Sequence, residues 1–148
     1  MPVKIVTEAF NPWEILQSHE QNLQEKAGKC GALSNFIGRM RDYNEGDDVT
    51  QMYLEHYPAM TTAHLNTICE EAMQKWDILD CLIVHRVGEI NPTDTIVLVA
   101  AWAGHRGSAF SACRYLIEEL KHRAPFWKRE TLLNGDVRWV EKNTSGDL

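Results

Sequence analysis

Apolar residues recur at spacings of three and four in two long segments, and this pattern predicts two amphipathic helices. The first helix is expected over residues 60–76, with an apolar stripe formed by Leu65, Ile68, Cys69, Ala72, Met73 and Trp76. The second is expected to follow His105 and to end near Arg123, with a stripe formed by Ala109, Phe110, Cys113, Leu116, Ile117 and Leu120. Ala124-Pro125 stops it, because proline cannot continue a helix. A shorter helix is expected over residues 13–23, since Pro12 suits a helix start.

Strands are predicted where apolar residues alternate with polar ones or run continuously. The expected strands cover residues 4–8, 32–40, 49–56, 81–87, 95–103, 126–131 and 137–140, and the last two flank the hairpin signal Asn134-Gly135-Asp136. Residues 44–48 are polar and are expected to form an exposed loop, and residues 88–93 a turn. Helices that link strand pairs allow some parallel pairing. The prediction is therefore an α+β fold with a mixed sheet.

The length and the apolar content indicate an ordinary globular protein. With 148 residues, the chain is expected to form one domain over residues 1–148, with a frayed tail at 142–148. Its first ten residues lack the apolar core of a secretory signal, and the longest apolar run, Ile96–Ala103, is far too short to cross a bilayer. We therefore expect a soluble, cytoplasmic protein that makes no membrane contact.

Known cofactor and nucleophile motifs are missing from the sequence. The four cysteines, Cys30, Cys69, Cys81 and Cys113, form no CxxC pair, which argues against a zinc knuckle and against a thioredoxin-type redox motif. The patterns HExxH, GxGxxG and GxSxG, the Walker loop and the EF-hand loop do not occur. No metal or other cofactor is therefore expected, and the cysteines are interpreted as small buried apolar residues.

Positive charge is concentrated near the end of a chain whose formal net charge is −6. Residues 105–130 contain six Lys or Arg against three acidic residues. A local excess of cations in an acidic protein indicates an acidic partner surface or an anionic small ligand. Nucleic acid is the weaker interpretation, because the rest of the chain would be repelled by a phosphate backbone.

Two basic groups lie on or near the second helix. His105 and Arg106 open it, where backbone N–H groups favour an anion, although the pair is also consistent with simple capping. Lys121 lies about four turns further on, and the chain reversal at Pro125 is expected to bring Lys128 towards it. The alternative is a basic helix C-terminus that only complements the helix dipole.

Two further arginine positions are less specific. Arg39 and Arg41 flank Met40 at a strand end, on one face if the strand period of two holds, and an exposed strand end explains them equally well. His85-Arg86 also follows a strand, and we interpret Arg86 as part of a structural ion pair with Glu89.

Six stretches of the chain, taken together and in sequence order, resemble the large subunit of molybdopterin synthase. The matching stretches are FIGRMRDYNEGDDV, LEHYPAMT, IVHRVGEINPTD, HRGSAF, LKHRAPFWKRE and the later RWVE, and the resemblance covers residues 31–141. The resemblance implies an α/β hammerhead-type domain with an added antiparallel portion. It also implies a sulfurtransferase that makes the molybdopterin dithiolene from cyclic pyranopterin monophosphate. The sulfur arrives as a thiocarboxylate on the C-terminal Gly-Gly of a small ubiquitin-like subunit, and two large subunits form the central homodimer of a heterotetramer.

The resemblance also implies roles for individual residues. Lys121 and Lys128 resemble the two catalytic lysines: Lys121 as base or acyl contact at the partner's terminal carbonyl, Lys128 in positioning the pterin and stabilising charge. The substrate-binding residues implied are His105 and Arg106, the strand-end residues Arg39, Met40 and Arg41, and Arg129 and Glu130 after Lys128. Relatives often carry basic residues in the tail, where this chain has only Lys142.

Two other functions remain open beside the one that the resemblance implies. One is a non-catalytic dimeric binding module that captures a ubiquitin-like partner through the basic segment. The other, weaker, is a phosphate-ester enzyme, against which the missing metal ligands and glycine-rich loops argue.

Overall fold

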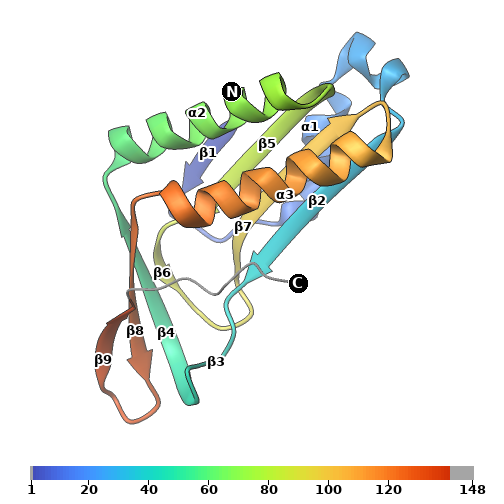
Figure 1. Cartoon of the computed structure of the whole chain (residues 1–148). Coiled ribbons are helices and arrows are strands. Elements are labelled where there is room, and N and C mark those ends of the chain that lie inside the picture. The colour runs from blue at the N-terminus through green and yellow to red at the C-terminus, as the bar shows by residue number, and fades with distance from the viewer. Residues whose placement is uncertain (1, 141–148) are drawn as a thin grey trace.

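The computed structural model describes residues 2–140 and contains two sheets and three α-helices within them (Figure 1). Residues 141–148, including Glu141, Lys142 and the tail expected to be frayed, lie outside the described residues. In chain order the elements are β1 (Val3–Val6), α1 (Pro12–Gln21), η1 (Gln24–Lys29, a 3-10 helix), β2 (Ala32–Arg39), β3 (Tyr43–Asn44), β4 (Asp47–His56), α2 (Pro58–Lys75), β5 (Ile78–Arg86), β6 (Gly88–Ile90), β7 (Thr95–Ala103), α3 (Arg106–Arg123), β8 (Phe126–Leu132) and β9 (Val137–Val140).

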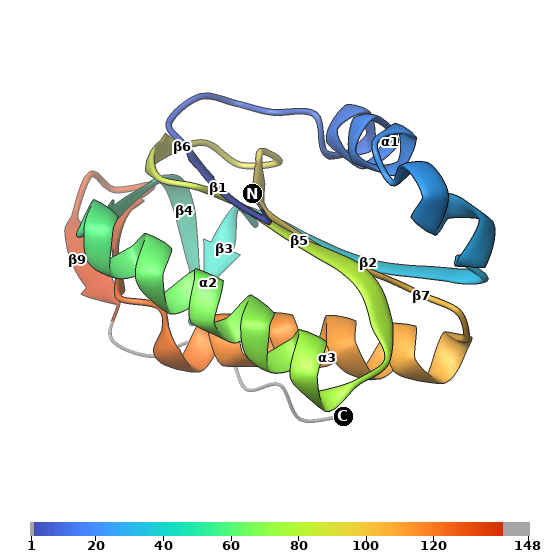
Figure 2. The same cartoon turned by 90° about the horizontal axis from the view of Figure 1, so that it is seen from above.

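The first sheet has the strand order β1-β5-β7-β2 and is mixed, as predicted. β1 pairs with β5 in parallel, whereas β7 pairs antiparallel with both β5 and β2. Helices α2 and α3 lie side by side on one face, and α1 lies on the other (Figure 2). Both faces of β5 and β7 are therefore buried, which explains why these two strands read as nearly continuous apolar runs.

The second sheet is antiparallel and projects beyond the helices (Figure 1). Its order is β3-β4-β8-β9, and β6 pairs with β4. The prediction of an added antiparallel portion is confirmed. Its own small core consists of Met40, Val49, Met52, Leu54 and Ile90.

Local signals explain the helix ends. The side chain of Asn11 accepts hydrogen bonds from the backbone N–H groups of Trp13 at 3.0 Å and Glu14 at 3.4 Å, and Pro12 occupies the first helical position. α3 ends at Arg123, as the Ala124-Pro125 sequence predicts.

The sequence interpretation was wrong in two short segments. The loop expected over residues 44–48 is a tight hairpin between β3 and β4, in which Glu45 and Gly46 have φ of 51° and 81°. Two positive φ angles in succession match the twist of a two-residue hairpin. The turn expected over residues 88–93 contains β6, whose buried Ile90 pairs with Met52. β3 and β6 are too short to show an alternation of apolar and polar residues.

Candidate active site

Lys121 and Lys128 line the same cavity, although they belong to different elements. α3 carries Lys121 in its last turn, the chain reverses at Pro125, and β8 returns with Lys128. Residues from β4, β5, β7 and β9 complete the walls. The cavity has a volume of about 100 Å³ and is lined by Met52, Leu54, His85, Ile96, Leu120, Lys121, Ala124, Phe126, Lys128 and Val140. A space of this size holds several water molecules.

The alternation of β8 decides which of its side chains face this cavity. Phe126, Lys128 and Glu130 share one face, and Phe126 and Lys128 line the cavity. Arg129 lies on the opposite face, where its guanidinium carbon is 5.1 Å from the ring centre of Tyr53 and 5.7 Å from that of Trp139. Arg129 therefore does not share the cavity with Lys128.

Electrostatics favour a reactive amine at Lys121. Burial lowers the pKa of Lys121, and the positive charge of Lys128 lowers it further. Both causes disfavour the ammonium form, so the free amine is present at lower pH than for an exposed lysine. An anion between the two lysines would reduce their repulsion, which makes the cavity suited to a carboxylate, a thiocarboxylate or a developing oxyanion.

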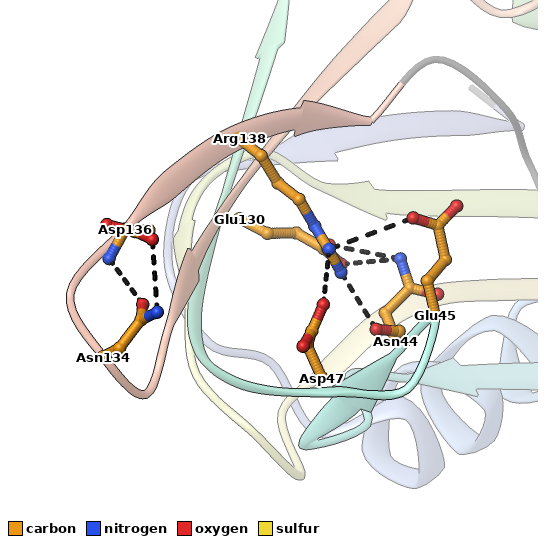
Figure 3. A network of polar contacts seen from close by, with 7 residues as sticks. All are labelled: Asn44, Glu45, Asp47, Glu130, Asn134, Asp136 and Arg138. Carbon is orange, nitrogen blue, oxygen red and sulfur yellow. Dashed lines mark hydrogen bonds and ion pairs between the residues drawn. The ribbon is translucent and has the colours of Figure 1, made fainter.

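The buried carboxylate of Glu130 is the centre of a polar network in the second sheet (Figure 3). The amide nitrogen of Asn44 donates to both carboxylate oxygens at 3.1 Å, and Nε of Arg138 donates to Oε1 at 3.2 Å. Arg138 also binds the carboxylate of Asp47 at 2.9 Å and the backbone carbonyl of Asn44 at 2.9 Å. Nζ of Lys128 lies 4.0 Å from Oε2 of Glu130. The network therefore joins the β3–β4 hairpin, β8 and β9 directly beside Lys128.

Sequence reasoning did not identify Asn44 and Arg138 as partners of Glu130. For Arg138, the signal is the hairpin prediction over residues 126–140, which places Glu130 opposite Arg138 across two paired strands. Nothing in the sequence indicates Asn44, which lies 86 residues from Glu130 along the chain.

Residues 39–41, at the end of β2, include one residue that packs behind the cavity wall and two exposed arginines. Met40 is buried and packs in the core of the second sheet with Met52 and Leu54, which line the cavity. Arg39 and Arg41 are exposed, and neither lines the cavity. β2 ends at Arg39 after a bulge, so the period of two on which we placed both arginines on one face does not extend to Arg41. The Arg41 guanidinium instead stacks over the ring of Tyr43 at 4.7 Å.

His105 and Arg106 lie at the opposite end of α3 from Lys121. Fifteen residues of helix correspond to about 22 Å at about 1.5 Å per residue. Both side chains are exposed, neither lines the lysine cavity, and His105 makes no capping hydrogen bond with its side chain. Within one chain, the structure does not bring these two residues together with Lys121 and Lys128.

His85 is a cavity residue that the sequence interpretation missed. Its strand alternation provides a signal, because His85 shares a face with Cys81 and Ile83, which pack against α2 and α3. Its neighbour Arg86 is a structural residue, as predicted, but with different partners. Nη1 donates to the carboxylate of Asp94 at 2.8 Å and Nη2 to the backbone carbonyl of Glu89 at 2.8 Å. The predicted ion pair with the Glu89 carboxylate was therefore wrong.

Residues 2–140 include no helix that is long and apolar enough to span a bilayer. Over the same residues, no three or more His, Cys, Asp or Glu side chains are arranged to hold a metal ion.

Comparison of the sequence and the structure with known proteins identifies the family of this chain. The model of the "MoaE protein" family matches residues 5–123, a span that includes Lys121 and ends before Lys128. A molybdopterin synthase catalytic subunit of Ralstonia nicotianae is 50% identical over 124 residues, covering 82% of this chain and 70% of the relative. The same-named protein of Pseudomonas aeruginosa is 42% identical over 146 residues, covering 98% and 93%. The crystal structure of molybdopterin synthase from Staphylococcus aureus superposes with a TM-score of 0.83 at 30% identity, covering 95% of this chain and 98% of that chain.

Proposed function

The chain belongs to the MoaE protein family, and we propose from this membership that it is the catalytic subunit of a molybdopterin synthase. It is a sulfurtransferase that acts in the cytoplasm. It takes sulfur from the thiocarboxylated Gly-Gly end of a small ubiquitin-like subunit and transfers it to cyclic pyranopterin monophosphate to make the molybdopterin dithiolene. Two copies form the central homodimer of a heterotetramer with one small subunit at each end.

The observation that carries this proposal is the shared cavity of Lys121 and Lys128. Lys121 is the base or acyl contact at the terminal carbonyl of the partner, because its lowered pKa makes the free amine accessible. Lys128 positions the pterin and stabilises the negative charge that develops as the carbonyl carbon is attacked. The sulfur belongs to the partner, so this chemistry requires no cysteine of the large subunit.

The other site residues that the resemblance implies act around the two lysines. Arg41 is the likelier direct substrate contact of the strand-end pair, Arg39 adds positive charge beside it, and Met40 supports the cavity wall from the core. Arg129 and Glu130 act by holding β8, since one packs on aromatic rings and the carboxylate of the other is already bound by Asn44 and Arg138.

His105 and Arg106 bind the phosphate of the substrate from the second large subunit. The separation of about 22 Å along α3 is far larger than a single pterin monophosphate can span. One substrate can therefore meet both groups only if different copies of the chain supply them, and the proposed homodimer provides a second copy.

Reconstitution tests the proposal. The purified chain is mixed with a thiocarboxylated small subunit and cyclic pyranopterin monophosphate, and molybdopterin is detected as its fluorescent oxidation product. We expect product only with the thiocarboxylate, and none with the same subunit ending in an ordinary carboxylate. Tight capture of the small subunit without pterin binding or product would instead support the non-catalytic binding module.

A further inference from the structure

Two glycines lie against each other where the chain enters β2 and where it leaves β7. The backbone N–H of Gly31 donates a hydrogen bond to the carbonyl of Ala103 at 2.9 Å, next to the first pair of the two strands, Ala32 and Ala103. A Cβ atom placed on Gly31 would lie 2.3 Å from the carbonyl oxygen of Gly104 and 3.3 Å from its carbonyl carbon. Close contacts between carbon and oxygen are about 3.3 Å or longer, so only glycine fits at residue 31 while Gly104 keeps its place.

This contact lies directly before the residues that open α3. Gly104 is followed by His105, the N-cap of α3, and by Arg106, its first residue. The side chain of His105 makes no capping hydrogen bond, in contrast to Asn11 at the start of α1. The start of α3 therefore lacks a side-chain cap, and the backbone that leads into it is held by its packing on Gly31.

The contact is tight on one side only. A Cβ atom placed on Gly104 would lie 3.7 Å from the backbone oxygen of Lys29, which is an ordinary van der Waals distance. A Cβ atom on Gly28, in the 3-10 helix η1, would meet no atom within 4 Å. None of these three glycines has a positive φ, so only space decides whether alanine fits at each of them. Alanine is therefore excluded at residue 31 and tolerated at residues 28 and 104.

We propose that Gly31 is a positioning residue of the synthase: it admits the carbonyl of Gly104 where any other residue would carry a Cβ atom, and so sets the place of the first turn of α3. The phosphate-binding pair His105 and Arg106 opens this turn, and the inference therefore rests on the proposed function. A Cβ atom at residue 31 would displace the carbonyl of Gly104 by about 1 Å, the difference between 2.3 Å and an ordinary contact. A displacement of about 1 Å in a group that binds substrate can lower the rate about 10²-fold.

Three alanine variants test the contact in the reconstituted synthase. We expect Gly31→Ala to raise KM for cyclic pyranopterin monophosphate about ten- to a hundredfold, while KM for the small subunit stays within about threefold of the parent value. Gly104→Ala should raise KM for the pterin less than about threefold, because its Cβ atom has room. Gly28→Ala is the matched control and should change neither KM. A variant that is only less stable would lower the rate by loss of folded protein without changing either KM.

A double-mutant cycle shows whether Gly31 acts through Arg106. Arg106→Ala removes the guanidinium whose place Gly31 sets, so the effects of the two substitutions should not add. We expect Gly31→Ala to raise KM for the pterin less than about threefold in the Arg106→Ala background. A full effect of Gly31→Ala in this background overturns the proposal. An unchanged KM in the single variant Gly31→Ala, or an equal rise in Gly104→Ala, overturns it as well.

A measurement without turnover keeps this inference separate from the proposed function. The backbone amide resonances of residues 105–108 are compared by NMR in labelled protein without substrate. We expect these resonances to move in Gly31→Ala and to stay near their parent positions in Gly28→Ala. An inactive parent protein would refute the proposed function, while the resonances still decide whether Gly31 sets the start of α3. Resonances that do not move in Gly31→Ala count against the proposal.

If Gly31→Ala does not fold, hydrogen exchange in the parent protein decides. The amide of Gly31 exchanges when its hydrogen bond to Ala103 opens, and a ligand that requires the closed contact makes this opening rarer. Free cyclic pyranopterin monophosphate at about ten times its dissociation constant should therefore slow this exchange about tenfold. The control is the amide of Gly135, which donates to the carbonyl of Leu132 at 2.9 Å in the β8–β9 hairpin. Exchange at Gly31 that does not slow when the pterin binds overturns the proposal.

Discussion

Replacing Glu130 by glutamine should destabilise the second sheet by an amount that the structure allows us to work out. The change keeps the size of the side chain and turns one acceptor oxygen into an NH₂ donor. Glu130 is buried, and its two oxygens serve Asn44 and Arg138, which both donate. Oε1 accepts from both donors and can continue to do so, but Asn44 loses its bond to Oε2. The new NH₂ group is a buried donor that faces the amide of Asn44 and the ammonium of Lys128, at about 1–3 kcal/mol for a buried group without a partner. Arg138 keeps Asp47 and is about a quarter exposed, so the lost ion pair adds no more than about 1 kcal/mol.

The expected total is about 2–3 kcal/mol in the free energy of unfolding. At about 2–4 °C per kcal/mol for a chain of this size, the midpoint of thermal unfolding should fall by about 5–10 °C. Circular dichroism at a fixed protein concentration measures it, because association also contributes to the apparent stability. Glu55→Gln on β4, which changes an exposed carboxylate, is the matched control and should shift the midpoint by less than about 2 °C. Equal shifts for the two variants would refute the claim that the Glu130 network holds this sheet.

Four further outcomes follow from the site. Lys121→Ala should lower kcat about 10²–10⁴-fold in the reconstituted assay while Lys29→Ala, at an exposed position in the 3-10 helix, leaves it unchanged; near-normal turnover by the first variant would contradict its role as base or acyl contact. Lys128→Ala removes a charge that lowers the pKa of Lys121, so the residual activity should rise with pH along a limb displaced to higher pH, and a limb displaced downwards would exclude this coupling. Mixing inactive Lys121→Ala and Arg106→Ala chains should restore part of the activity in mixed dimers, which carry one intact site if the two residues act across the dimer; no recovery after verified exchange of chains would place them in separate roles. The pKa of His85 is about 3 in the folded protein against an ordinary value of 6.5, so the unfolded state binds more protons between these two pH values. As pH falls from 6.5 to 3, this group should therefore reduce the free energy of unfolding by up to about 1.4 kcal/mol per pH unit. Denaturant titrations in which His85→Phe shows the same dependence of stability on pH as the parent protein would argue against this.

The long periodic segments were predictable because their signals are local. α2 and α3 follow from apolar stripes and from Pro58 and Pro125 at their ends, and β7 follows from its continuous apolar run. The approach of Lys128 to Lys121 was predictable for the same reason, because its signal is also local. Only seven positions separate the two lysines, and the proline between them ends the helix and forces the chain to reverse.

The failures concern contacts between segments that are distant in sequence. β3 and β6 are too short for an alternation and exist because β4 offers them partners. In the sequence, Glu130 is one charged residue among several in a basic segment, and nothing indicates that it is buried. Folding buries its carboxylate against Asn44, which lies 86 residues away along the chain. His85 stands in the sequence only as the neighbour of Arg86, and its burial beside Phe126 and α3 appears only in the folded protein.

The amino-acid sequence alone determined the helices and long strands, the cationic segment and the family resemblance, since period, proline position and residue order are properties of neighbouring residues. Only the tertiary structure decided which cations share a cavity, that His105 and Arg106 lie a helix length away from it, and that a neutral histidine, His85, also lines it. The physical reason is that burial sets the pKa values and hydrogen-bond partners of these groups, and burial is produced by the packing of elements that are far apart along the chain.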